Sequence, residues 1–87
     1  MNFGITIKRD RKIIRLLVEK ISETKTQEKY KVIARSQSFV LQNNRPLLIA
    51  KGLKYFPVKW RVIVGAVNNA HILEQITKAI ENKITYT

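Results

Sequence analysis

The sequence predicts a small α+β domain with an N-terminal helix, a three- to four-stranded antiparallel meander and a C-terminal helix packed on the sheet. Apolar residues recur every three or four positions in residues 8–22 and again in residues 72–84, which is the period of a helix. Between them, residues 29–65 mostly alternate apolar and polar side chains, as strands do. The 87 residues leave room for one domain, 1–87, whose thin core would gain stability from oligomerisation.

The N-terminal helix is predicted over residues 8–22. Three cations, Lys8, Lys12 and Arg15, share its polar face near the start, where the helix dipole disfavours positive charge by about 0.3–1 kcal/mol each. Two interpretations fit this cluster equally well: the cations bind a partner, or they lie on a solvated face of the helix. The apolar face consists of Ile14, Leu17, Val18 and Ile21.

The meander is predicted from alternation and from turn residues. The apolar positions change parity near residues 36–38, which indicates a bulge or turn there. Asn43 and Asn44 are typical of a two-residue hairpin loop, and Pro46 would then begin a strand over residues 47–51. The last strand is predicted over residues 58–64.

The C-terminal helix has the clearest pattern. Asn68 or Asn69 can cap its N-terminus, and a continuous apolar stripe would pack on the sheet. His71 falls in the first turn without a visible partner and is assigned no role. The stripe consists of Ile72, Leu73, Ile76, Ala79, Ile80 and Ile84.

The charge balance is the main functional signal. Lys and Arg number 17 against 6 Asp and Glu, which gives a net charge of +11. Residues 1–35 carry +6, residues 36–68 carry +5, and residues 69–87 carry no net charge. A positive surface built by the first two thirds of the chain indicates a polyanionic partner, although a basic surface can also serve solubility alone.

Several classes of protein are excluded or disfavoured. Without cysteine there is no disulfide framework and no thiolate metal site, and a cytoplasmic or other reducing intracellular compartment fits best. The longest apolar run, residues 62–67, is far too short to span a membrane, so no integral membrane association is expected. We find no glycine-rich phosphate loop and no paired acids at metal spacing, so neither an enzyme nor a cofactor or metal is predicted.

Residues 51–67, KGLKYFPVKWRVIVGAV, interleave cations with aromatic residues, as single-strand nucleic-acid binders do. Trp60, however, shares its parity with Val58, Val62 and Val64, which predicts a core position rather than a stacking platform. Tyr55 precedes the strand and is the preferred stacking residue.

These observations predict a non-enzymatic domain that binds DNA or RNA through a basic sheet face and a basic first helix. The alternative is a protein-interaction module, either a homodimer or a small subunit of a larger assembly. Binding of residues 8–15 to an anionic membrane surface ranks last, because this segment has no Trp or Phe anchor. The candidate nucleic-acid contacts are Lys8, Arg9, Arg11, Lys12, Arg15, Lys31, Arg35, Lys51, Lys54, Tyr55, Lys59 and Arg61.

Overall fold

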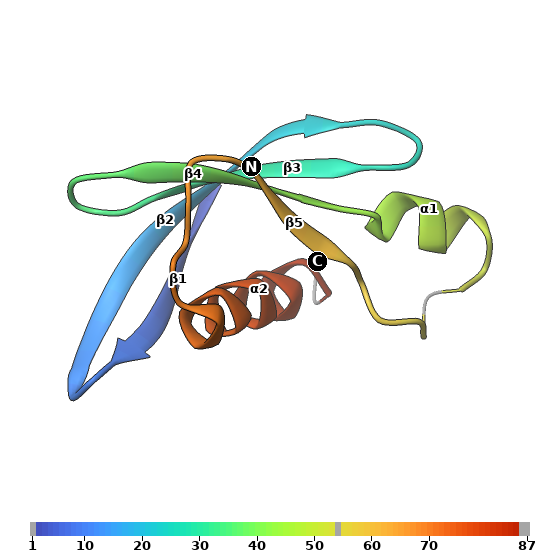
Figure 1. Cartoon of the computed structure of the whole chain (residues 1–87). Helices are drawn as coiled ribbons and strands as arrows, with labels where there is room; N and C mark the ends of the chain where they lie inside the picture. Colours follow the sequence, from blue (N-terminus) through green and yellow to red (C-terminus); the bar gives the residue numbers. More distant parts are fainter. Residues whose placement is uncertain (1, 54, 86–87) are drawn as a thin grey trace.

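The chain folds into an antiparallel sheet with a long helix across one face (Figure 1). The structure is a computed structural model that describes residues 2–53 and 55–85. In these residues five strands form one sheet in the order β1-β2-β3-β4-β5, each antiparallel to its neighbour. The elements are β1 (Asn2–Arg9), β2 (Lys12–Glu23), β3 (Glu28–Ile33), β4 (Ser38–Asn43), α1 (Arg45–Ala50), β5 (Trp60–Val64) and α2 (Ala70–Thr85).

The prediction of an N-terminal helix over residues 8–22 is wrong, because this segment belongs to a β-hairpin. A two-residue turn at Asp10 and Arg11 joins β1 to β2, and Asp10 adopts a φ of 57°, which aspartate tolerates better than most residues. The spacing was misleading because β2 is apolar on both faces. Apolar residues on each face of a strand recur every second position, and when both faces are apolar, residues taken from the two faces together also lie three and four positions apart.

One of these two sets lies on solvent. Ile13, Leu17 and Ile21 of β2 are 69%, 43% and 50% exposed, whereas Leu16 and Val18 are buried. Ile21 sits at a register shift between Lys20 and Ser22, which marks a β-bulge. The sheet therefore presents apolar side chains on the face opposite the core.

The meander also differs from its prediction, since it has five strands in the described residues rather than three or four. Asn43 ends β4 and Asn44 precedes helix α1, so the predicted hairpin loop and the strand over residues 47–51 are wrong. Pro46 lies in the first turn of α1, where its missing N–H removes no helical hydrogen bond. The turn predicted near residues 36–38 is confirmed, because a loop closed by the 2.8 Å hydrogen bond from Ala34 N to Gln37 O joins β3 to β4.

Helix α2 begins at an asparagine cap. The Asn69 Oδ1 atom accepts hydrogen bonds from the backbone N–H groups of His71, at 2.9 Å, and Ile72, at 3.2 Å. The buried stripe of α2 then packs on the inner face of the sheet. This core consists of Ile5, Ile7, Leu16, Val18, Tyr30, Val32, Phe39, Leu41, Ile76, Ile80 and Ile84.

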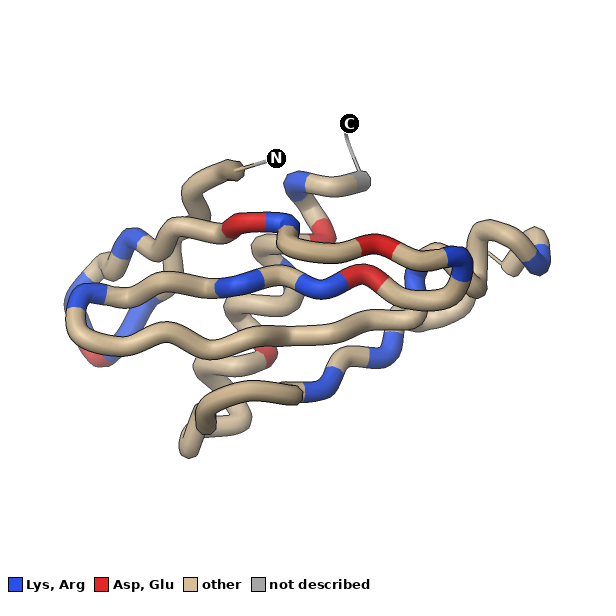
Figure 2. Tube along the Cα trace, turned by 90° about the horizontal axis from the view of Figure 1, so that it is seen from above, with Lys and Arg blue, Asp and Glu red and all other residues tan. Residues whose placement is uncertain are grey.

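The opposite face of the sheet is not covered by any element in the described residues, and Figure 2 looks onto it. The strand register places both apolar and basic side chains on this face, pointing away from the core. Leu17, Ile33, Val40 and Val64 are apolar members, and Arg15, Lys29, Lys31 and Arg61 are basic members. We call this the open face.

Two glycines with positive φ allow a matched test of backbone strain and packing. A Cβ atom at Gly65 (φ 81°) would lie 2.9 Å from Phe39 Cβ, whereas one at Gly52 (φ 70°) would meet nothing within 4 Å. Gly52→Ala should therefore cost only the left-handed strain of about 1–2 kcal/mol. Gly65→Ala adds overpacking of about 1–3 kcal/mol and should destabilise the fold more in urea unfolding. Equal losses of unfolding free energy would contradict the close packing of Gly65 on β4.

Candidate nucleic-acid interface

Six cations lie at the end of the sheet that holds both the β1–β2 turn and the β3–β4 loop, although the turn reaches well away from the loop (Figure 1). Alternate turns of a meander lie at the same end, so Arg35 joins residues that precede it by 20 or more positions in sequence. Figure 2 shows basic segments collecting at this end, on the left of the view. We call the set the basic hairpin end: Lys8, Arg9, Arg11, Lys12, Arg15 and Arg35, with Asp10 as its acidic member.

The strands behind the basic hairpin end are held by apolar packing and by hydrogen bonds. The β2–β3 register starts at Leu17 opposite Ile33, so the tip of the β1–β2 ribbon extends past β3. The inner side of the ribbon is held by Ile5 and Ile7, which are buried against α2. The Gln75 side chain adds two 2.9 Å hydrogen bonds, donating from Nε2 to Lys8 O and accepting at Oε1 from Lys8 N. The six cations are exposed, and within the described residues none of them forms an ion pair.

The other predicted contacts lie elsewhere. Lys31 and Arg61 are on the open face, opposite Glu19 and Gln42 respectively in the register. Lys51, Tyr55 and Lys59 lie near α1, at the other end of the sheet, and Lys54 falls outside the described residues. The predicted set is therefore divided between the basic hairpin end, the open face and the α1 end.

The positions of the aromatic residues determine whether they are available to stack on nucleic-acid bases. Trp60 lies on the inner face, with its ring centroid 6.1 Å from that of Tyr30, which confirms the core position that its parity predicts. Val64 does not share that face, because a register shift beside Val40 turns it outward. Tyr55 is 89% exposed but lies far along the sheet from the hairpin turn.

Sequence reasoning missed one basic residue of the open face. Lys29 points outward from β3, two positions before Lys31 and opposite Gln42 of β4. The alternation of Lys29 and Lys31 around the buried Tyr30 was the available signal, because side chains two apart in a strand share a face.

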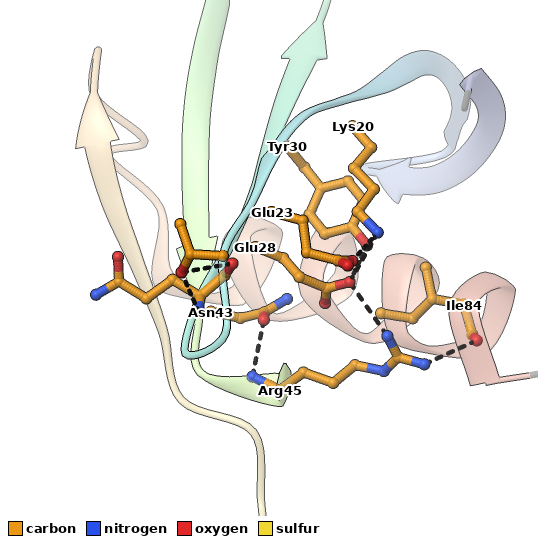
Figure 3. Close-up of polar contacts among 9 residues, drawn as sticks. Lys20, Glu23, Glu28, Tyr30, Asn43, Arg45 and Ile84 are labelled. Carbon is orange, nitrogen blue, oxygen red and sulfur yellow. Dashed lines mark hydrogen bonds and ion pairs between the residues drawn. The ribbon is translucent and has the colours of Figure 1, made fainter. Parts of the chain in front are cut away.

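A second group of charged residues surrounds a buried carboxylate, that of Glu28, at the α1 end (Figure 3). The Glu28 side chain is 1% exposed, and its Oε2 atom lies 3.2 Å from Lys20 Nζ. The same oxygen accepts hydrogen bonds from Arg45 Nη1 and from the Tyr30 hydroxyl, both at 3.1 Å. Arg45 Nη2 also donates to the Ile84 carbonyl of α2 at 3.3 Å, and Lys20 pairs closely with Glu23.

This cluster has the features of a structural network. Its carboxylate is already held by three donors, and the described residues contain no group of three or more side chains able to bind a metal ion. Glu28, Asn43 and Trp60 form one cross-strand row in which each keeps a buried polar atom without a protein partner. Such atoms cost about 1–3 kcal/mol each, so the α1 end depends on its charge pairs more than the apolar centre does.

No protein-family model, curated protein or solved structure matches this chain. Within the described residues, no helix combines the length and the apolar character needed to cross a membrane.

The contacts of Arg45 predict that replacing it lowers the free energy of unfolding. Arg45→Met would leave the buried Glu28 carboxylate with fewer donors and the Ile84 carbonyl without its guanidinium, so unfolding free energy should fall by about 2–3 kcal/mol. Lys25→Met, at an exposed position of the neighbouring β2–β3 turn, should change it by less than about 0.5 kcal/mol. Urea unfolding of both variants checks this, and similar values for the two would refute the structural role of Arg45.

The burial of Tyr30 predicts how the free energy of unfolding changes at high pH. Burial, and secondarily Glu28, raises the pKa of the Tyr30 phenol above its ordinary value, so the folded chain holds this proton more tightly than the unfolded chain. The hydrogen bond from Lys20 to Glu23 raises the pKa of Lys20 as well. Both contributions are complete below about pH 10 and are lost as the pH rises further.

Unfolding free energy should therefore decline above about pH 10. Tyrosinate absorbance, recorded over the same pH range, should show a late ionisation step that coincides with this decline. Tyr30→Phe should remove this late step, whereas Tyr55→Phe should keep it. A late step that survives Tyr30→Phe would refute the assignment.

Proposed function

We propose that this protein is a non-enzymatic nucleic-acid-binding domain that contacts phosphates through the basic hairpin end and the cations of the open face. The observation that carries the proposal is the presence of six exposed cations at one end of the sheet, five from the β1–β2 hairpin and one, Arg35, from the β3–β4 loop, with Asp10 as the acid among them. Phosphate contacts by such residues release condensed counterions, which supplies much of the affinity of basic proteins for nucleic acid. The absence of cysteine is compatible with a cytoplasmic or other reducing intracellular compartment.

The shape of the ribbon favours duplex over single-stranded nucleic acid. A two-stranded antiparallel ribbon fits the major groove of B-DNA, and the Gln75 hydrogen bonds to Lys8 would limit the conformational freedom that the β1–β2 tip loses on entering it. Arg9 and Arg11 at the turn can contact phosphate oxygens with two N–H groups each. Stacking on single-stranded bases has less support, because the exposed aromatic residues Tyr55 and Phe56 lie between α1 and β5, away from the basic hairpin end. The other aromatic side chains described, Phe3, Tyr30, Phe39 and Trp60, face the core.

A protein-interaction module is the second candidate, in the form of a homodimer or a small subunit of a larger assembly. The observation in its favour is the exposure of Ile13, Leu17 and Ile21 on β2. Light scattering across a concentration series tests self-association, and a monomer at all concentrations would exclude the homodimer.

Binding is tested by fluorescence anisotropy with labelled duplex DNA, single-stranded DNA and single-stranded RNA over a range of salt concentrations. The unaltered protein should bind at low salt, with a log–log slope of about −0.9 per phosphate contacted on duplex DNA. A triple variant, Arg9→Gln, Arg11→Gln and Lys12→Gln, should bind at least about tenfold more weakly and reduce the slope by roughly 2–3.

The matched control removes the same charge from other parts of the surface through Lys51→Gln, Lys59→Gln and Lys83→Gln. It should retain most of the affinity, because these residues lie outside the basic hairpin end. Equal losses for the two triple variants would show attraction to net charge alone. An absence of binding to every probe at low salt would refute the proposal.

A further inference from the structure

The outer edge of β1 presents backbone groups that the sheet does not use. Arg9 and Lys12 flank the two-residue turn, so Arg9 exchanges its hydrogen bonds with β2 and alternate residues before it do the same. The residues between them, Lys8, Thr6 and Gly4, therefore direct N–H and C=O away from the sheet. The two bonds of Lys8 to Gln75 confirm this direction.

Gln75 behaves toward Lys8 as an added strand would. Its amide accepts from the N–H and donates to the C=O of one residue, which is the pattern of an antiparallel ladder. The ladder stops there, because within the described residues no hydrogen bond reaches the outer N–H and C=O of Thr6 and Gly4. Unpaired edges of this kind are templates for pairing with another chain.

A groove runs along these free groups, between the edge of β1 and helix α2. It has a volume of about 540 Å³ and is lined by Gly4, Ile5, Thr6, Ala79, Asn82 and Lys83. Small residues on both walls, Gly4 and Ala79, leave the backbone accessible. The one charged residue that lines the groove is the cation Lys83.

We propose that this groove binds an extended acidic peptide segment of another protein, which adds a sixth strand next to β1. The backbone of the segment would pair with Gly4 and Thr6, continuing the ladder that Gln75 begins at Lys8. Its carboxylates would lie near Lys83. A second copy of this chain fits less well, because each copy carries a net charge of +11 and would bring an equally basic β1 to the edge.

This inference does not depend on the proposed nucleic-acid binding. The edge groups of Gly4 and Thr6 lie along the side of the sheet, whereas the proposed phosphate contacts cluster at its turns and on its open face. The Arg9, Arg11 and Lys12 triple variant should therefore keep most of its affinity for the peptide.

The probe is an octapeptide of alternating valine and glutamate with blocked ends. Two-dimensional NMR of the labelled protein should show shifts centred on Gly4, Thr6 and Ala79, and the amides of Gly4 and Thr6 should become protected from hydrogen exchange. A peptide of the same charge, N-methylated on the edge that would face β1, should bind at least about tenfold more weakly because it cannot complete the ladder.

Two variants test the protein side. Thr6→Pro removes an N–H that does not pair with β2, so it should abolish peptide binding while circular dichroism shows a retained sheet. Lys83→Glu should weaken binding about fivefold, whereas Lys51→Glu, the same change near α1, should weaken it much less.

Equal binding of the plain and N-methylated peptides would overturn the proposal, because it would reduce the interaction to charge attraction. Shifts centred on the basic hairpin end or on the open face would do the same. Dimerisation without peptide, lost in Thr6→Pro, would overturn it in favour of a second copy at this edge.

Discussion

The buried carboxylate of Glu28 constrains the geometry of the whole α1 end. A carboxylate with 1% exposure requires donors, and the Oε2 atom of Glu28 has three, from β2, β3 and the start of α1. Because Arg45 also donates to Ile84 at the end of α2, one guanidinium links the sheet to both helices. Through this hydrogen bond the network adds a directional contact to the apolar packing of α2 under the sheet.

Helix α2 is thus attached at both ends by polar contacts, Arg45 to Ile84 at its C-terminus and Gln75 to Lys8 near its N-terminus. Between these contacts Ile76 and Ile80 bury themselves against the inner face. The N-terminal attachment keeps the β1–β2 ribbon in place past the limit of β3. A ribbon held in this way has less conformational freedom to lose in the phosphate contacts proposed for its tip.

Strand β1 connects the two proposed surfaces. Its end at Arg9 joins the basic turn, while Gly4 and Thr6 lie on its free edge beside α2. Gln75 lies between these two surfaces, because its side chain bonds the backbone of Lys8 and leaves the backbone edge at Gly4 and Thr6 open. One strand could therefore take part in phosphate contacts and in strand addition without competition for the same backbone groups.

The sequence by itself determined the C-terminal helix, the core position of Trp60 and the excess of positive charge, because each depends on local periodicity or composition. It could not separate helix from hairpin over residues 8–22, since a strand apolar on both faces imitates helical spacing. Only the tertiary structure decided which cations meet. Arg35 comes to line one surface pocket with Arg15 because β3 returns to the same end of the sheet, a long-range arrangement that no local pattern encodes.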